Sequence, residues 1–150
     1  MLTLSPLMPE HERAARALVT DALAGTRYLA RTVEQLDAAL RFEDPEYLAV
    51  VAEDGDDVVA LALFGAVAGA RACTKLHTLV GDDDALEPLA SGVAQVCRDS
   101  GERLVVCELA DDAVFGAARE ALLGAGFREE GRVYDYVAEG VALLLLVWRP

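Results

Sequence analysis

Asparagine and isoleucine are absent from this 150-residue chain, and lysine occurs only at Lys75 among its 13 basic residues. The three cysteines are odd in number and their spacing matches no metal-binding motif. We therefore expect reduced thiols, as in the cytoplasm, and no metal site. The longest apolar runs, residues 58–70 and 141–148, are shorter than the roughly 18 to 20 residues that span a bilayer. The sequence predicts neither a disulfide framework nor a membrane span.

The net charge is strongly acidic, at −13 with a pI near 4.4. Nucleic acids and anionic membranes repel such a protein, so we expect neither as a partner. Apolar residues make up 54% of the chain, enough to exclude disorder and to fill one core. Residues 1–150 are therefore predicted to form a single domain.

The hydrophobic spacing predicts eleven elements in the order β α α β β β α β α β β. The predicted strands cover residues 2–4, 46–53, 58–65, 73–80 and 104–109, then a strand through 133–137 and a last one at 141–148. The predicted helices run from Pro9 to Gly25, from Thr32 to Leu40, from Asp84 or Pro88 to Asp99, and from Asp111 or Asp112 to Gly124.

Local signals support this order. The segment 54–57, Asp-Gly-Asp-Asp, is typical of a hairpin turn. Thr32 and Gln35 match a capping box, and the glycines at 124 and 126 are typical of a helix end. The strand-helix-strand unit at 73–109 must be a right-handed parallel crossover. We therefore predict an α/β fold with a mostly antiparallel mixed sheet, one parallel crossover and helices on both faces.

This order resembles the GNAT acetyltransferase superfamily over the whole chain. The opening Leu2-Thr3-Leu4-Ser5-Pro6-Leu7 resembles its first strand, and the meander from Tyr47 to Val80 resembles its second to fourth strands. The segment Ala118–Phe127, with Gly126-Phe127 before a final hairpin, resembles its C-terminal motif. The resemblance implies a GNAT-like acyl-CoA N-acyltransferase fold that uses acetyl-CoA.

The resemblance also implies a cofactor loop of the form Arg/Gln-x-x-Gly-x-Gly/Ala, with a helix N-terminus that holds the diphosphate. Spacing from Val80 puts this loop at residues 85–90, where no glycine remains and Pro88 removes an N–H donor. Asp82, Asp83 and Asp84 precede it; they either weaken diphosphate binding or simply cap the helix. By family position, the cofactor-binding residues are Leu79, Val80, Ala85, Leu86, Glu87, Leu89 and Ala90.

A second departure concerns the general acid. Many GNAT enzymes place a tyrosine four residues before the Gly-Phe pair, where this chain has Leu122, and Phe115 replaces the usual asparagine at the helix start. Candidate replacements are His77, which titrates near neutrality, Tyr134 and Glu108. His77 and Tyr134 also have structural alternatives: a packed or partly exposed strand histidine, and a buried aromatic pair of Tyr134 with Tyr136.

Two functions follow from these observations. The first is an N-acetyltransferase that transfers an acyl group from acyl-CoA to an unknown small-molecule or protein amine; an acidic cleft would suit a cationic acceptor. The second is a catalytically silent GNAT-fold domain that serves as a ligand-binding or protein-interaction module. An open cleft between the fourth and fifth strands would favour the first. The continuous apolar strand 141–148 predicts burial on both faces, either under helices or in a homodimer.

Overall fold

One mixed sheet of seven strands organises the computed structural model, which describes all residues from 1 to 150. The strand order is β1-β2-β3-β4-β5-β7-β6, and β4 with β5 is the parallel pair. The strands are β1 (Leu2–Pro6), β2 (Leu48–Asp54), β3 (Asp57–Ala66), β4 (Cys73–Gly81), β5 (Leu104–Ala110), β6 (Arg128–Ala138) and β7 (Val141–Trp148). The helices are α1 (Glu12–Leu23), α2 (Leu29–Leu40), α3 (Asp83–Asp99) and α4 (Gly116–Gly124), with 3-10 turns η1 (Pro9–His11) and η2 (Ala113–Phe115).

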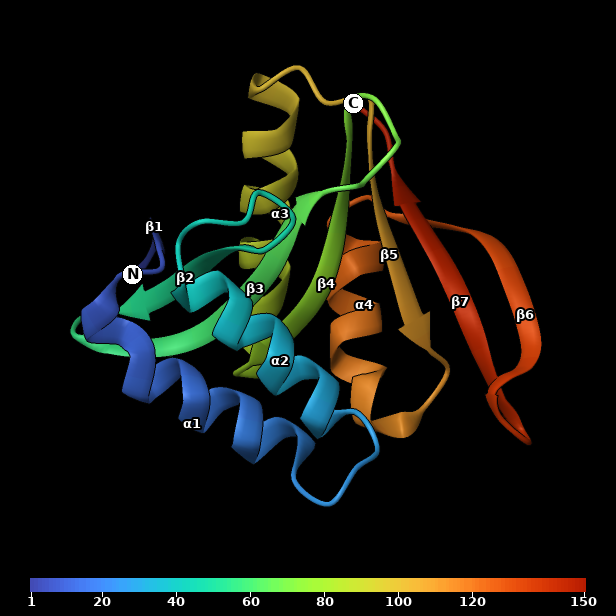
Figure 1. Cartoon of the computed structure of the whole chain (residues 1–150), viewed down its shortest axis with the longest axis horizontal. Coiled ribbons are helices and arrows are strands. Elements are labelled where there is room, and N and C mark those ends of the chain that lie inside the picture. Colours follow the sequence, from blue (N-terminus) through green and yellow to red (C-terminus); the bar gives the residue numbers. More distant parts are fainter.

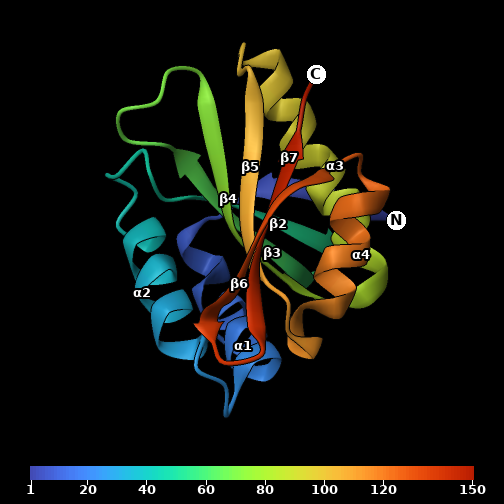
Figure 2. The same ribbon diagram turned by 90° about the vertical axis from the view of Figure 1, so that its right-hand side faces the viewer.

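Helices cover both faces of the sheet, as the sequence predicts. Figure 1 shows α1 and α2 in front of the strands, and Figure 2 shows them on the side opposite α3 and α4. Each layer has its own core: Val19 and Leu36 pack on one face, and Leu89 and Phe127 pack on the other. Phe115 packs against both clusters, so the two cores meet at that side chain. The predicted fold class is confirmed.

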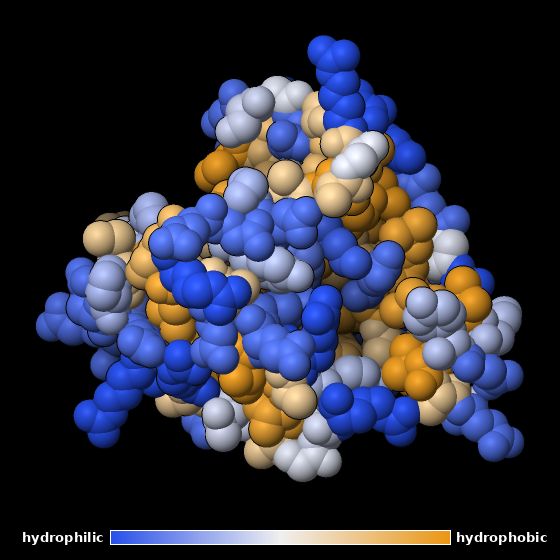
Figure 3. All heavy atoms as spheres, in the orientation of Figure 1, coloured by the Kyte–Doolittle hydropathy of each residue, from blue (hydrophilic) through white to orange (hydrophobic).

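The final strand β7 lies inside the sheet, between β5 and β6. Leu144 and Leu146 are fully buried under α4 and α3, but Leu145 on the opposite face is 36% exposed, and Val133 on β6, which lies opposite Leu143, is 52% exposed. Figure 3 shows apolar surface on the right of the view, where Figure 1 places β6 and β7. The alternative in which helices cover both faces of β7 is therefore wrong for the face of Leu145, because α1 and α2 do not extend over it, and the homodimer alternative stays a prediction.

The predicted capping box is also wrong. Helix α2 begins at Leu29, and Thr32 is a buried residue whose N–H donates to the carbonyl of Tyr28 at 3.1 Å. The preceding turn determines this earlier start, because the Thr26 hydroxyl donates to the carbonyl of Leu23 at 2.7 Å and reverses the chain after α1. The predicted β2–β3 hairpin is confirmed, with Gly55 in the left-handed region at φ 65°. None of the helices is long and apolar enough to cross a membrane.

Candidate functional site

Strands β4 and β5 separate in the middle of the sheet. Their parallel pairing covers only Cys73–Lys75 against Leu104–Val106. On the other side of β4, the register with β3 shifts between Leu63 and Phe64, which leaves His77 unpaired as a β-bulge. Bulges bend a strand and concentrate near active sites. Figure 1 shows β4 and β5 together at the top and apart at the bottom. Beyond the bulge, β4 therefore has no partner strand on the β5 side.

Two adjoining cavities occupy the space that this separation opens. The first, which we call the inner cleft, has a volume of about 230 Å³ and is mostly apolar. The second, which we call the outer chamber, has a volume of about 420 Å³ and is mostly polar. Four residues line both of them: Arg31, Gln35, His77 and Glu108. The site is thus a narrow apolar space that opens into a wider polar one, with His77 at the boundary.

The environment of His77 favours its neutral form. Its Nε2 lies 2.8 Å from the carbonyl oxygen of Glu46, and its ring stacks on Tyr47 with centroids 5.0 Å apart. A carbonyl only accepts hydrogen bonds, so Nε2 carries the proton and Nδ1 keeps a free lone pair. Burial lowers the pKa of His77 from its usual 6.5, and the positive charges of Lys75 and Arg31 lower it further. A neutral imidazole at the cleft can accept a proton.

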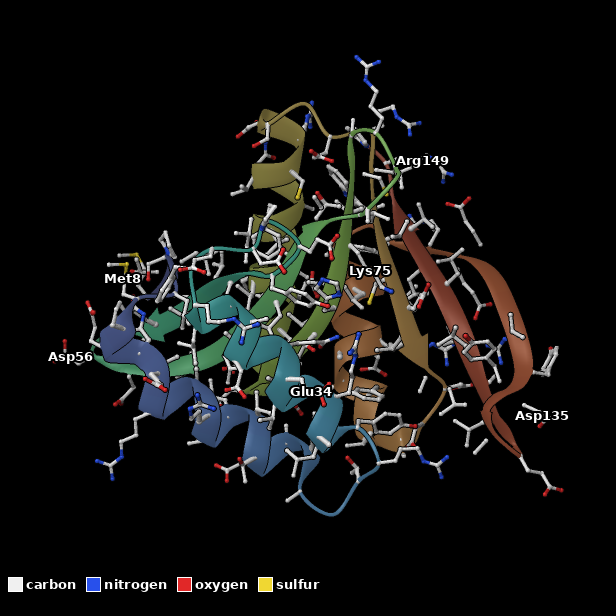
Figure 4. All side chains as sticks on the ribbon, viewed as in Figure 1. Met8, Glu34, Asp56, Lys75, Asp135 and Arg149 are labelled. Carbon is white, nitrogen blue, oxygen red and sulfur yellow. The ribbon has the colours of Figure 1, made fainter.

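Glu108 lies on the same boundary, on β5. Its carboxylate is 3.1 Å from the Lys75 ammonium, and its side chain is 48% exposed. Figure 4 shows Lys75 near the centre of the sheet, where β4 and β5 are still side by side. Glu108 is therefore a solvated, paired carboxylate that reaches both cavities. Its role as a base stays a prediction.

The tyrosines of β6 are placed differently from the expectation. Tyr134 and Tyr136 are 75% and 67% exposed, and neither lines the two cavities. The β6–β7 register breaks between Val133 and Ala138, and Asp135 adopts a left-handed φ of 55°. The predicted buried aromatic pair is wrong, because this irregular segment turns both rings into solvent. Figure 4 shows Asp135 at the outer edge of the sheet. A catalytic role for Tyr134 has no geometric support.

Sequence reasoning missed Tyr28, which precedes α2 and lines the inner cleft. Its hydroxyl donates to Asp112 at 2.9 Å, and its ring meets Phe115 edge-on at 4.7 Å. Asp112 also accepts from the N–H of Val114, which confirms it as the predicted cap of this segment. Because 84 residues separate Tyr28 from Asp112, no local pattern could reveal the contact. It ties the α1–α2 loop to the start of η2, which leads into α4.

The two family positions that differ in this chain both face the inner cleft. Leu122 is fully buried and Phe115 is partly buried, and both contribute to its wall. Cys107 on β5 also lines it, but burial raises the pKa of this thiol to about 12. The thiol therefore stays protonated and unreactive at neutral pH. The inner cleft contains no side-chain acid at the position where many GNAT enzymes have one.

The predicted cofactor loop is absent, because the chain enters α3 directly. β4 ends at Gly81 and α3 begins at Asp83, so residues 85–90 are helical. The side chains of Ala85, Leu86, Leu89 and Ala90 are buried in the core. The prediction of a loop at this position is wrong. The cofactor-binding role of these residues of α3 stays a prediction, and among the predicted binding residues only Glu87 has an exposed side chain. Leu79 lines the inner cleft, whereas Val80 packs in the core under α1 and α2.

The start of α3 is acidic. Asp82 is the N-cap residue but its side chain makes no capping hydrogen bond, so the predicted cap is wrong in this respect. Asp83 and Asp84 are exposed in the first turn, where carboxylates stabilise the helix dipole. The first N–H groups of a helix lack intrahelical partners and attract anions. Here three carboxylates compete with any anion that approaches these groups.

Solved structures match the chain over its whole length, although no protein-family profile and no curated protein sequence matches it. A protein assigned to the GNAT family of acetyltransferases, from Desulfovibrio desulfuricans, superposes with a TM-score of 0.83 at 18% identity, over 99% of both chains. The ribosomal-protein-S18-alanine N-acetyltransferase of Escherichia coli gives a TM-score of 0.75 at 16% identity, over 99% of this chain and 94% of that one. A Bacillus subtilis acetyltransferase in complex with CoA gives 0.74 at 8%, over 100% and 99%.

These structures share one architecture with the chain, and all three are acetyltransferases by name. At identities of 8 to 18%, the superposition establishes the fold alone, and the activity has to be argued from the residues of the site. The chain has the GNAT acetyltransferase fold. No group of three or more His, Cys, Asp or Glu side chains is arranged to hold a metal ion.

Proposed function

We propose that the protein is an N-acyltransferase that transfers a short acyl group from acyl-CoA to an amine. The observation that carries this proposal is the separation of β4 from β5 at the His77 bulge, which opens the inner cleft beside an unpaired stretch of β4 backbone. The solved structures add support, because one of them contains CoA and another is named for acetylation of a ribosomal-protein alanine.

The inner cleft suits the acyl-pantetheine end of the donor. Its apolar wall, which includes Leu79 and Leu122, suits the methylene groups, and the free edge of β4 offers backbone groups to the pantetheine amides. Its volume of about 230 Å³ lies below the roughly 300 to 1,000 Å³ of typical ligand pockets. This limit favours acetyl over longer acyl groups. The phosphate end fits less well, because it would approach the carboxylates of Asp83 and Asp84.

The residues at the boundary between the cavities can perform acyl transfer. The amine nitrogen attacks the thioester carbonyl carbon, so that a C–N bond forms, the C–S bond breaks and CoA leaves as its thiolate. Nδ1 of His77 takes the proton that the amine loses, and the resulting imidazolium or water returns a proton to the thiolate. Backbone N–H groups of β4 beyond the bulge, near Leu79 and Val80, stabilise the developing oxyanion. Glu108 is the second candidate base.

A catalytically silent ligand-binding or protein-interaction domain is the alternative. The apolar residues Leu122 and Phe115, at the two family positions that face the inner cleft, favour it. The acidic start of α3 favours it as well. Both functions use the same fold, so binding of the acyl-CoA donor is the property that distinguishes them.

The test is titration calorimetry with acetyl-CoA and with CoA at low salt, followed by a thiol-release assay with a panel of amines. Micromolar binding at one site per chain, with CoA release that depends on an amine, would support the acyltransferase. In that case His77→Gln should lower the turnover, whereas the same change at His11, which lines neither cavity, should not. A folded protein that gives no heat at millimolar acetyl-CoA would exclude the acyltransferase and favour the silent domain.

The proposal extends to assembly and location. The uncovered face of β6 and β7, with Leu145 and Val133, is apolar enough to support the predicted homodimer. Light scattering coupled to size exclusion measures this directly, and a mass near 16.0 kDa would exclude the dimer. The free thiols of Cys73, Cys97 and Cys107 support a cytoplasmic location.

A further inference from the structure

We propose that the acceptor is a small amine that also carries a carboxylate, and that Arg31 in the outer chamber binds this carboxylate. This inference rests on the proposed acyltransferase function and names the class of its acceptor. It differs from the cationic acceptor that an acidic cleft would suit.

The first argument is the charge of the two cavities. The chain as a whole has 26 acidic and 13 basic residues. The lining of the inner cleft and outer chamber has the opposite sign of balance, with three basic residues, Arg27, Arg31 and Lys75, against two acidic ones, Glu46 and Glu108. A basic site on an acidic protein attracts an anionic group that the rest of the surface repels. The charge of the cavities therefore does not favour the cationic acceptor that an acidic cleft would suit.

The second argument is that the Arg31 guanidinium is not neutralised by the protein. Its one ion pair is with Glu34 on the same helix, at 3.5 Å, and both side chains are about two-thirds exposed. Such a pair is long and solvated, and contributes little. Lys75, by contrast, is paired with Glu108 at 3.1 Å. Arg31 thus keeps most of its donors, in the fork geometry that binds a carboxylate through two hydrogen bonds.

The third argument is that the fold places Arg31 at the boundary between the two cavities. Arg31 and Gln35 are one turn apart on the same face of α2. The Gln35 side-chain oxygen accepts from the hydroxyl of Thr78 at 3.1 Å, immediately after the His77 bulge. Helix α2 is therefore attached to the bulged part of β4. Arg31 and His77 both line the two cavities, so a ligand that lies between these side chains can present its amine to His77 and its carboxylate to Arg31.

Three amines with the same four-carbon chain test the inference: 4-aminobutyrate, 4-amino-1-butanol and 1,4-diaminobutane. Their far ends are a carboxylate, a hydroxyl and an ammonium group. With acetyl-CoA as donor, the thiol-release assay should give a kcat/KM for 4-aminobutyrate at least about tenfold above the other two, the size of one lost charge-assisted contact. Arg31→Gln should raise the KM for 4-aminobutyrate about tenfold and leave that for 4-amino-1-butanol unchanged. Arg41→Gln, the same change at the other end of α2, is the control.

A binding measurement separates this inference from the proposed function. The ring protons of His77 are followed by NMR during titration with 4-aminobutyrate alone. A saturable shift that Arg31→Gln abolishes supports binding of the carboxylate by Arg31, whether or not acetyl-CoA is turned over. If the shift occurs without turnover, only the acyltransferase function is rejected. Equal turnover of the three amines, or a preference for 1,4-diaminobutane, would overturn the inference and leave the acyltransferase intact. Absence of both shift and turnover would overturn both.

Discussion

Neutralising the acidic start of α3 should strengthen acetyl-CoA binding and weaken the fold at the same time. The variant is Asp83→Asn with Asp84→Asn, which removes two exposed carboxylates from the first turn of the helix. The proposed diphosphate position lies at this helix end, so its two charges face those two carboxylates. Asp99→Asn, at the far end of the same 17-residue helix and about 24 Å away at 1.5 Å per residue, is the matched control.

The magnitude follows from Coulomb's law. A unit charge pair about 8 Å apart in water contributes about 0.5 kcal/mol, so four repulsive pairs amount to about 2 kcal/mol. At 0.1 M salt the Debye length of about 10 Å reduces this by about half, which corresponds to about fivefold in affinity. At 0.01 M salt the Debye length of about 30 Å leaves about 1.5 kcal/mol, or slightly more than tenfold.

The stability effect has the opposite sign. Each carboxylate in a first helical turn contributes about 0.3 to 1 kcal/mol, so the double variant should melt a few degrees lower. Asp99→Asn removes a negative charge from the helix C-terminus and should not lower the melting temperature. Calorimetric titration of acetyl-CoA at both salt concentrations, with thermal unfolding of each variant, measures both effects. An affinity that stays unchanged or falls in the double variant would refute the proposed position of the diphosphate.

Three further perturbations test other parts of the structure. Burial lowers the pKa of His77 below 6.5, so the unfolded chain binds the proton of this histidine more tightly than the folded chain does. The contribution of His77 to the free energy of unfolding should therefore be fully present above pH 6.5 and decrease as the pH is lowered. Urea titrations between pH 7 and 5 should show a shallower decline in His77→Gln, and an equal decline would contradict the assigned burial. Gly81→Ala should lower the free energy of unfolding by at least about 2 kcal/mol, because φ at Gly81 is +139° and the new Cβ would lie 2.3 Å from the carbonyl oxygen of Val59. A melting temperature equal to that of the parent protein would contradict this geometry. Leu146→Ala, at a fully buried position, should cost about 2 to 5 kcal/mol by urea unfolding, and a loss under about 1 kcal/mol would show that β7 is not packed as described.

Sequence patterns predicted the architecture because local chemistry determines most of it. The hairpin at Gly55, the parallel crossover and the final hairpin each follow from turn residues and spacing, and the structure confirms them. The resemblance also identified two positions, Leu122 and Phe115, that line the inner cleft. A linear sequence motif can identify these two positions because they lie close to each other in the sequence.

The remaining errors have tertiary causes. Thr32 matches a capping box, but the turn after α1 starts the helix three residues earlier, at Leu29. This shift brings Arg31 into the helix and over the outer chamber. Tyr134 looked like a core residue by alternation, and an irregular β6 exposes it. Tyr28 could not be found at all, because its partner Asp112 is far away in the sequence. Contacts between distant segments define the mouth of the cleft, and no local pattern encodes them.

The position of β7 has a consequence for how the protein is made. β7 follows every other element in chain order, yet it lies between β5 and β6 and is the partner of both. During synthesis the backbone of β5 therefore stays open on one side until Val141–Trp148 has emerged, and β6 has no neighbour until then. An open edge is a template for pairing with another chain. The open edge of β5 is therefore the part of the nascent chain that most needs protection from pairing with a second copy until β7 is in place.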